Sequence, residues 1–252
     1  MMTVRHLRGL LLPLLLLAAW EYASRQDAAG AYAFVSLSKV GSALLELLGN
    51  GELPVNLLAS LARTSSGLAL GMLAGIALGA LMALSPLANR LTAPLFHALR
   101  QVPMLGWIPL IALWFGNGEP AKLLIVSVAA FYPMVLNTYE GLRQVDVRQR
   151  EVGQVLMLDR WQQLRLILLP GALPSIATGV LQALAFAWVT AVGSELFLAS
   201  GAGLGNLMMN AEAGARMEVI IVCVLCIGLC GYLMTWLCTR FCRRLLRWRT
   251  TD

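Results

Sequence analysis

The chain has unusually little charge for its length. Of its 252 residues only 13% are charged and 59% are hydrophobic, whereas a typical soluble domain has roughly 25% charged residues. The mean hydropathy of +0.74 points the same way. These values exclude an ordinary soluble globule, because too little polar surface is present to cover one in water. We therefore expect an all-α integral membrane protein made of a single spanning domain, residues 1–252.

Lysine is nearly absent, and this bears on nucleotide chemistry. The chain has two lysines, Lys39 and Lys122, and neither follows a glycine. A P-loop needs Gly-Lys-Ser/Thr after a glycine-rich turn, so the sequence contains none. The two histidines, His6 and His97, have no neighbouring nucleophile or metal-ligand cluster. We predict no catalytic residue, no metal site and no cofactor in this chain.

Cysteine is also scarce and confined to one place. All five cysteines lie in or just after the last apolar segment: Cys223, Cys226, Cys230, Cys238 and Cys242. The first two have the spacing of a metal or redox pair, but they lie within an apolar run and have no histidine nearby. We predict free, buried thiols.

Long charge-free runs are what the chain has in abundance. A helix needs about 20 apolar residues to cross the hydrocarbon core of a bilayer. We predict six transmembrane helices, at residues 7–24, 60–86, 91–116, 121–140, 171–197 and 217–239. The turn-forming residues 116–120 join the third to the fourth. Apolar residues at helical spacing within 36–50 predict an amphipathic helix on the outer membrane surface.

Basic residues are distributed unevenly along this arrangement. With the N-terminus in the cytosol, 14 of the 19 lysines and arginines fall on the cytosolic side. Positive charge favours that side, so we expect both termini and segment 141–170 to be cytoplasmic. The net charge of +6 then reflects membrane topology and not nucleic-acid binding. The arginine-rich tail after residue 239 predicts contact with anionic membrane lipid.

The first 20 residues allow a second interpretation. A basic start followed by an apolar run also fits a cleavable signal peptide, with small residues at Ala29, Ala31 and Ala33 as the cleavage region. Its removal would leave five spans and put the two ends of the chain on opposite sides of the membrane. The bias of the basic residues agrees with either possibility.

Glycine recurs every four residues in the second predicted span, at Gly67, Gly71, Gly75 and Gly79. Such a stripe of small residues lets another helix backbone approach closely. That helix belongs either to the same chain or to a second copy of it, and the sequence leaves both possibilities open.

Polar and helix-breaking residues in or beside apolar spans are costly, so they are candidates for an aqueous path. We select as candidate translocation-path residues Arg63, Arg100, Pro103, Glu195, Asn206 and Asn210. For Arg63 and Glu195 there are other interpretations. They are either interfacial side chains that reach water or a mutual structural pair.

The polar segment 140–171 contains five arginines, and its apolar residues follow helical spacing. Asp159 is a good N-cap for a second short helix that starts at Arg160, and Pro170 is expected to end that helix. The pattern predicts two helices joined by a turn. An apolar stripe on such a pair suits a groove in a soluble partner or, alternatively, a membrane surface.

This segment resembles the cytoplasmic coupling loop, or EAA motif, of ABC-importer permeases. That motif is a Glu followed by two small residues. A Gly stands four positions after the second small residue, and nine more residues separate it from Ile-x-Leu-Pro. Here Glu151 begins the motif, and residues 152–153 take the small positions. Met157 stands in the glycine position, and residues 167–170 close the motif. Segments 101–122, 166–180 and 200–211 are similar to the sulfonate, nitrate and taurine importer branch.

The resemblance implies a type I ABC-importer permease fold with a coupling-helix pair. It implies an ATPase-coupling interface at Arg150, Glu151, Val152, Gly153, Met157, Leu158, Asp159, Trp161, Ile167 and Pro170. The implied partners are a cytosolic ATPase dimer that binds ATP and Mg²⁺, a second permease copy in a homodimer, and an extracytoplasmic substrate-binding protein. The implied location is the bacterial inner membrane.

The substrate implied by the resemblance is a small anion such as a sulfonate, taurine or nitrate, with a vitamin precursor or an aromatic compound as the alternative. An ion-coupled secondary transporter is the alternative from another class. It would need carboxylates in the middle of the membrane, but the one candidate, Glu195, lies near the end of its predicted span.

Overall fold

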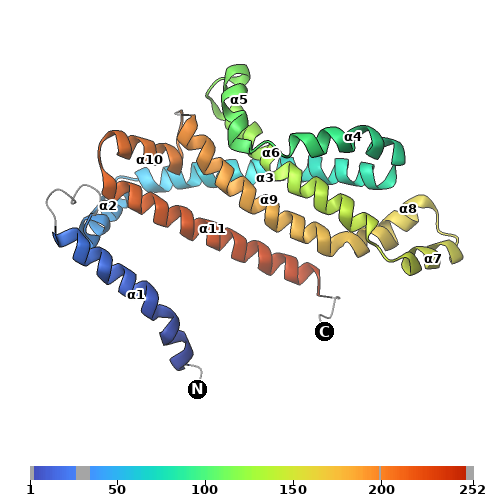
Figure 1. Ribbon diagram of the computed structural model, residues 1–252, viewed down its shortest axis with the longest axis horizontal. Helices are drawn as coiled ribbons and strands as arrows, with labels where there is room; N and C mark the ends of the chain where they lie inside the picture. Colours follow the sequence, from blue (N-terminus) through green and yellow to red (C-terminus); the bar gives the residue numbers. More distant parts are fainter. Residues whose placement is uncertain (1–2, 27–34, 199, 248–252) are drawn as a thin grey trace.

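The computed structural model describes residues 3–26, 35–198 and 200–247, and every regular element within them is a helix (Figure 1). The elements are α1 (Thr3–Gln26), α2 (Leu37–Gly49), α3 (Glu52–Leu84), α4 (Pro86–Leu99), η2 (Met104–Trp107), α5 (Ile108–Phe115), α6 (Glu119–Arg143), α7 (Val147–Val155), α8 (Arg160–Gln163), η3 (Leu164–Leu168), α9 (Leu169–Phe197), α10 (Leu204–Ala213) and α11 (Met217–Leu245). The predicted all-α fold is confirmed.

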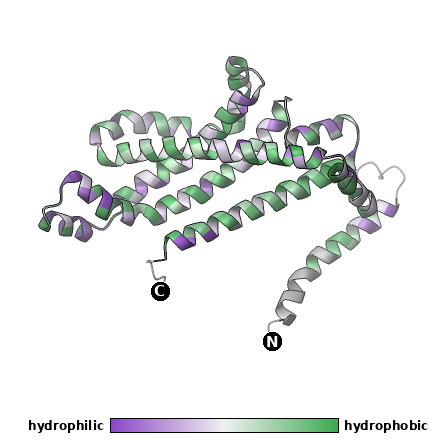
Figure 2. Ribbon diagram, turned by 180° about the vertical axis from the view of Figure 1, so that it is seen from behind, coloured by the Kyte–Doolittle hydropathy of each residue, from purple (hydrophilic) through white to green (hydrophobic). Residues whose placement is uncertain are grey.

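Helix α6 forms the centre of the bundle. Helices α3 and α9 both pack along it, and its residues Ile125, Val126 and Met134 are fully shielded from solvent. The outer surfaces of α3 and α11 are largely apolar and exposed, and Figure 2 shows hydrophobic residues along most of the length of these helices. This distribution suits helices that face lipid on one side and protein on the other.

The glycine stripe lies where α3 crosses α6. A Cβ atom at Gly71 would lie 2.3 Å from the carbonyl oxygen of Ser127, and one at Gly79 would lie 2.6 Å from that of Val135. Only glycine leaves room for two backbones at this separation. The stripe therefore serves packing within the chain, which was the first of its two interpretations.

Four helices in the described parts of the chain are long and apolar enough to cross a membrane. They are α3, α6, α11 and the continuous helix Arg160–Phe197. Helix α4 and the segment Met104–Phe115 would together make a fifth, but they meet at an angle of 89°. The predicted span 91–116 is therefore not one straight helix. Helix α1 covers the predicted span 7–24 but is not among these four, so six spans remain a prediction.

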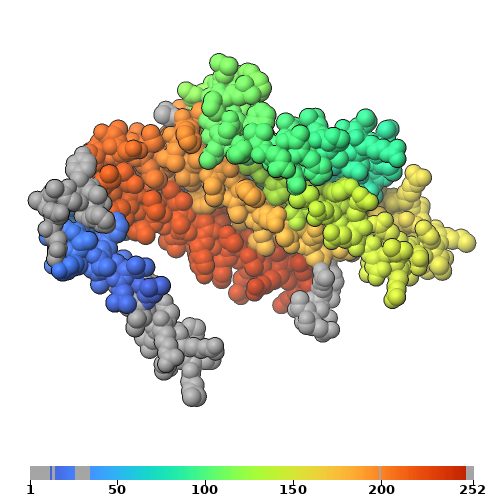
Figure 3. Space-filling model, viewed as in Figure 1, coloured from blue at the N-terminus to red at the C-terminus, as the bar shows by residue number. Residues whose placement is uncertain are grey.

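The break after α4 follows from proline. Pro103 lacks an amide hydrogen and restrains the residue before it to extended conformations, so a helix cannot run through this point. Pro109 occupies the first turn of α5, where a missing amide hydrogen costs little. Helix α5 consequently projects from the side of the molecule (Figure 3).

Helix α2 forms close to the predicted range 36–50 and packs against the bundle through Val40, Ala43 and Leu47. Its residue Glu46 lies 2.9 Å from Arg216, just before α11, and Arg216 also pairs with Glu218 at 3.2 Å. The hydrogen bonds to these carboxylates raise the pKa of Arg216. The location of α2 on the outer membrane surface remains a prediction. The proposed cleavage region at residues 29–33 lies outside the described residues.

Pro170 does not end the second helix of the polar segment, contrary to the prediction. Helices α8, η3 and α9 run on as one helix, Arg160–Phe197. In η3, a π-helix, the amide of Leu169 donates to the carbonyl of Leu164. Pro170 then falls in the first turn of α9, a position where the chain tolerates a missing donor.

Candidate functional site

The predicted site residues fall into two main groups at opposite ends of the long molecule. The helix pair α7–α8 extends beyond the ends of α6 and α9, and a buried polar cluster lies where α3 and α9 approach α10 (Figure 1). A third, smaller group surrounds the break after α4.

Both helices of the pair begin at an aspartate. The carboxylate of Asp146 accepts a hydrogen bond from the amide of Arg148 at 3.0 Å and caps α7. At α8, Asp159 accepts from the amide of Gln162 at 2.7 Å, while the Gln162 side chain accepts from the amide of Asp159 at 2.9 Å. This reciprocal pair is a capping box. The predicted N-cap at Asp159 is confirmed.

A close contact between Gly153 and Ile167 packs α7 against η3. A Cβ atom on the buried Gly153 would lie 2.6 Å from Cδ1 of Ile167. On the other side, the guanidinium of Arg150 donates to the carbonyls of Leu142 at 2.7 Å and Arg143 at 3.2 Å. These contacts attach α7 to both η3 and the end of α6.

Met157 lies in the turn between the two helices and has a backbone φ of +50°. This left-handed conformation is natural for glycine and costs other residues free energy, because Cβ crowds the backbone. The side chain itself is 91% exposed, so it makes little contact that would offset the cost. The backbone conformation therefore explains why the motif favours glycine at this position.

The helix pair and the adjoining η3 carry a group of exposed apolar side chains, which we call the loop patch: Val147, Val152, Val155, Leu156, Met157, Trp161 and Leu166. Glu151 is exposed beside them and has no hydrogen-bond or ion-pair partner among the described residues. Leu158 is half-buried. Several large exposed apolar side chains within one short segment are typical of an interaction site.

A cavity of about 380 Å³ separates α7 from the start of α9. It is lined by Gln149, Val152, Leu166, Ile167, Pro170 and Gly171. The predicted coupling residues Val152, Ile167 and Pro170 thus line one shared hollow, and Val152 also belongs to the loop patch.

At the other end of the bundle, Glu195 is completely buried and Arg63 is 5% exposed. The two side chains form an ion pair. The Glu195 carboxylate also accepts from the Ser60 hydroxyl at 2.8 Å and from the amide of Gly205 at 2.9 Å. Arg63 uses its other nitrogens to bind Glu119 at 2.6 and 3.0 Å. Of the interpretations for Arg63 and Glu195, the mutual pair is observed.

The loop between α9 and α10 wraps around this cluster. A Cβ at Gly203 would lie 2.4 Å from the carboxyl carbon of Glu195, so the loop can approach the carboxylate only with glycine there. Lys122, fully buried, donates to the carbonyl of Ser200. The Asn206 amide donates to the same carbonyl at 2.9 Å. Asn206 is therefore part of the buried cluster.

Sequence reasoning did not identify Ser60, Glu119 and Lys122 as members of this cluster. Glu119 and Lys122 stand at a predicted membrane boundary, where charged residues are ordinary, and a single serine gives no signal. The partners of these side chains lie on distant segments of the chain, and no local pattern reveals them.

The other candidate path residues lie elsewhere. Arg100 and Pro103 are exposed at the break after α4, and Asn210 is exposed on α10. Arg100 lines a cavity of about 240 Å³ together with Gln101, Tyr132, Pro133, Leu136, Gln182 and Phe186. The structure thus brings Arg63, Glu195 and Asn206 together but not Arg100, Pro103 and Asn210.

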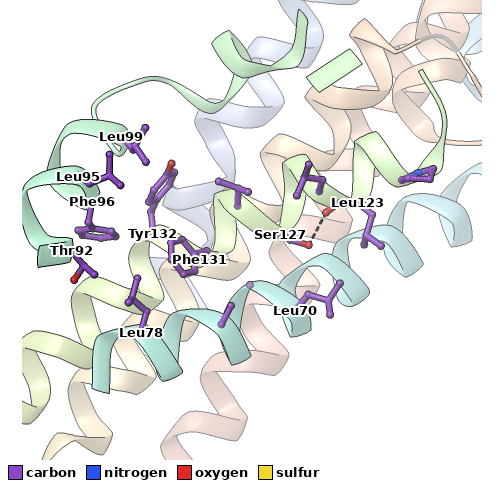
Figure 4. A pocket seen from close by; sticks show the side chains of 15 residues that line it. Leu70, Leu78, Thr92, Leu95, Phe96, Leu99, Leu123, Ser127, Phe131 and Tyr132 are labelled. Carbon is purple, nitrogen blue, oxygen red and sulfur yellow. Dashed lines mark hydrogen bonds between the residues drawn. The ribbon is translucent and has the colours of Figure 1, made fainter. Parts of the chain in front are cut away.

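A larger cavity of about 750 Å³ opens between α3, α4 and α6 (Figure 4). Its walls are mainly apolar, with Leu70, Leu78, Leu95 and Phe96 among them, and it contains no charged side chain. Tyr132 lines both this cavity and the smaller one beside Arg100. The Tyr132 side chain is therefore shared by the lining of an apolar cavity and of a more polar one.

The cysteines are free thiols in the described structure, with Cys223 and Cys242 buried. Burial raises the cost of forming a thiolate, so such thiols are poor nucleophiles and metal ligands. Across the described residues, no three His, Cys, Asp or Glu side chains gather in a way that could hold a metal ion.

Comparison of the sequence with those of known proteins gives three findings. Residues 67–247 match the family model described as binding-protein-dependent transport system inner membrane component. A Bacillus subtilis (strain 168) protein that bears the name of an aliphatic sulfonates transport permease is 32% identical over 97% of this chain and 88% of its own length. The taurine transport system permease protein of Escherichia coli (strain K12) is 34% identical over 77% of this chain and 70% of its own length.

Among solved structures, a chain of the MetNI methionine ABC transporter in an inward-facing conformation superposes with a TM-score of 0.66. The alignment covers 75% of this chain and 94% of that one at 19% sequence identity. At this identity the likeness concerns the fold alone.

Proposed function

Because the chain belongs to the family of binding-protein-dependent transport system inner membrane components, we propose that it forms the membrane path for a small oxyanion in an ATP-driven importer. It is a permease subunit of an ABC importer, and in this family ATP hydrolysis belongs to a separate subunit. The family gives no support to an ion-coupled secondary transporter.

The substrate class rests on the relatives named for aliphatic sulfonates and for taurine. Both kinds of molecule carry a sulfonate group. We extend the class to nitrate-like anions, which also present three oxygen acceptors, in a plane in nitrate and as a pyramid in a sulfonate. An extracytoplasmic binding protein would deliver the anion to the end of the bundle that holds the Arg63–Glu195 cluster.

The observation that carries the coupling role is the loop patch. It exposes seven apolar side chains, Trp161 among them, on the helix pair and the adjoining η3. Such side chains are costly in water and favourable in the groove of a soluble partner. We assign that groove to a cytosolic ATPase dimer, which would hold ATP and Mg²⁺.

The route for movement into the membrane is the uninterrupted helix Arg160–Phe197. A displacement of α8 by the ATPase would be transmitted along η3 and α9 toward Glu195. The close contact at Gly153 and the hydrogen bonds of Arg150 would make α7 move together with η3 and α6. Switching between two discrete arrangements of packed helices is a recognised way to carry such a signal. Two copies of the permease in the bacterial inner membrane, with cytoplasmic termini, would complete the path.

The test replaces Trp161 by Glu and measures two quantities after purification of the complex: the amount of cognate ATPase that co-purifies, and its ATP hydrolysis rate. A charge within the groove should reduce co-purification about tenfold or more, because a buried aromatic anchor is lost and a carboxylate is desolvated. The matched control is Leu45→Glu, the same kind of change on an exposed position of α2, which should leave co-purification unchanged. Equal co-purification of wild type and Trp161→Glu would overturn the assignment of the loop patch.

A further inference from the structure

The small cavity beside Arg100 lies at the middle depth of the bundle. Its residues Tyr132 and Pro133 stand near the centre of α6, and Gln182 stands near the centre of α9. Both helices are long and apolar enough to span a bilayer. The cavity is therefore near the middle of these two predicted spans, and its residues Arg100, Gln101 and Gln182 are exposed in the single chain.

Arg100 is an unmatched charge at this depth. Among the described residues it has no hydrogen-bond or ion-pair partner, and no carboxylate lines the cavity. Arg63, by comparison, is paired with both Glu119 and Glu195. A cation in the membrane interior is expensive and is typically retained for a function such as binding a counter-ion or a substrate.

The neighbouring amides are arranged as donors. The side-chain amide of Asn137 donates to Oε1 of Gln182 at 2.9 Å and to the carbonyl of Pro133 at 2.8 Å. Because the oxygen of Gln182 already accepts from Asn137, its NH₂ group is the part left to interact with a ligand. Gln101 adds a second amide to the same cavity. The polar lining thus offers a cation and amide donors without an anionic competitor.

The backbone supports the same conclusion. Residues 100–103 lie between α4 and η2, where the chain turns by 89° and leaves regular helix. Irregular backbone at membrane depth is tolerated where it is buried in protein or lines a water-containing cavity. Broken helices of this kind are common at substrate sites of transporters.

We propose that this cavity is an oxyanion-binding site within the membrane path, with Arg100 binding two oxygens of the anion and Gln101 and Gln182 donating to the others. A guanidinium matches the geometry of such oxygens through two parallel hydrogen bonds. The volume of about 240 Å³ suits a small sulfonate or nitrate, and the larger cavity has no charged group to bind one. This inference rests on the proposed importer function and deepens it.

The test uses the full complex of permease, ATPase and binding protein, reconstituted in liposomes and supplied with labelled taurine or nitrate. Uptake is measured with the binding protein at saturation, so that the rate reports the permease. Arg100→Gln should lower the rate about ten- to hundredfold, the loss expected for a charged hydrogen bond. Arg100→Lys should keep part of the rate, because the charge remains. The control Arg90→Gln removes an exposed arginine from α4, the helix that ends just before Arg100, and should transport as the wild type does.

Two further measurements separate this inference from a general loss of structure. The Arg100→Gln complex should retain its ATPase subunit and its hydrolysis rate without binding protein. Gln182→Glu should also lower anion uptake, because a carboxylate in the cavity would pair with Arg100 and repel the substrate.

Wild-type uptake by either Arg100→Gln or Gln182→Glu would overturn the site while leaving the permease function intact. An equal loss in Arg100→Gln and Arg90→Gln would overturn it as well. If the wild-type complex retains its ATPase but takes up neither anion, the oxyanion class is wrong and the site falls with it.

Discussion

The guanidinium of Arg63 on α3 is paired with the carboxylate of Glu195 on α9, and both side chains are buried. The two residues are 132 positions apart in the sequence. A buried ion pair is expensive to form, because both charges lose their hydration, and removal of one partner leaves the other charge uncompensated. The pair therefore favours the observed packing of α3 against α9, because an arrangement that separates the two residues would leave each charge without its partner.

Arg63→Met should lower the free energy of unfolding by about 3–5 kcal/mol, since the buried Glu195 carboxylate would lose its main partner. The double variant Arg63→Met/Glu195→Met should lose clearly less than the sum of the two single variants, because it removes both charges. The measurement is denaturant unfolding of the purified permease in detergent. Additive losses would contradict a direct coupling.

The control for this series is Arg216→Met. Arg216 pairs with Glu46 and Glu218 at the surface, and exposed pairs contribute about 1 kcal/mol or less. If Arg216→Met lowered the free energy of unfolding as much as Arg63→Met does, the assay would respond to the removal of any arginine and not to the buried pair in particular.

Met157→Gly should stabilise the permease by roughly 0.5–1 kcal/mol, because glycine adopts a φ of +50° without the crowding that a Cβ causes. Met157→Ala removes the same side chain but keeps the Cβ, so it separates the backbone effect from side-chain contacts. Met157→Val should destabilise, since β-branched residues tolerate this conformation poorly. Thermal unfolding of the three variants in one detergent gives the order of their stabilities. A melting temperature for the glycine variant below that of the alanine variant would refute the explanation.

Gly71→Ala should destabilise the bundle by about 1–3 kcal/mol. The new methyl group would meet the backbone oxygen of Ser127, and α3 would have to move away from α6 to make room. Gly228→Ala on α11 is the matched control, because a Cβ there meets no atom within 4 Å; it should be neutral or stabilising, given the helix propensity of alanine. Thermal unfolding distinguishes them, and equal behaviour of both variants would count against close α3–α6 packing.

The membrane orientation can be tested by single cysteines in a variant in which all five native cysteines are replaced by alanine. Glu151→Cys lies in the helix pair, and Asn117→Cys lies in the exposed turn between α5 and α6. In intact spheroplasts, a membrane-impermeant maleimide should label position 117 and should reach position 151 only after permeabilisation. Labelling of position 151 in intact spheroplasts would place the loop patch outside and remove its assignment to an ATPase.

Some of the site was readable from local sequence. The N-cap at Asp159 was predicted because a capping interaction acts over three residues, and the capping box is present. The end of the same helix was predicted wrongly at Pro170, because the π-helix Leu164–Leu168 lets the chain pass through that proline. A π-helix depends on how the neighbouring helices pack, and no residue pattern in the sequence predicted it.

The sequence by itself determined the class of protein, the all-helical content and the motif that marks the coupling segment. Hydropathy, capping and turn formation act within a few residues, so composition and spacing are sufficient to express them. The tertiary structure alone decided which helix the glycine stripe faces, that Arg63 meets Glu119 and Glu195, and that Arg100 and Gln182 share a cavity. These contacts join residues far apart in the chain, and they exist only once the helices have packed side by side.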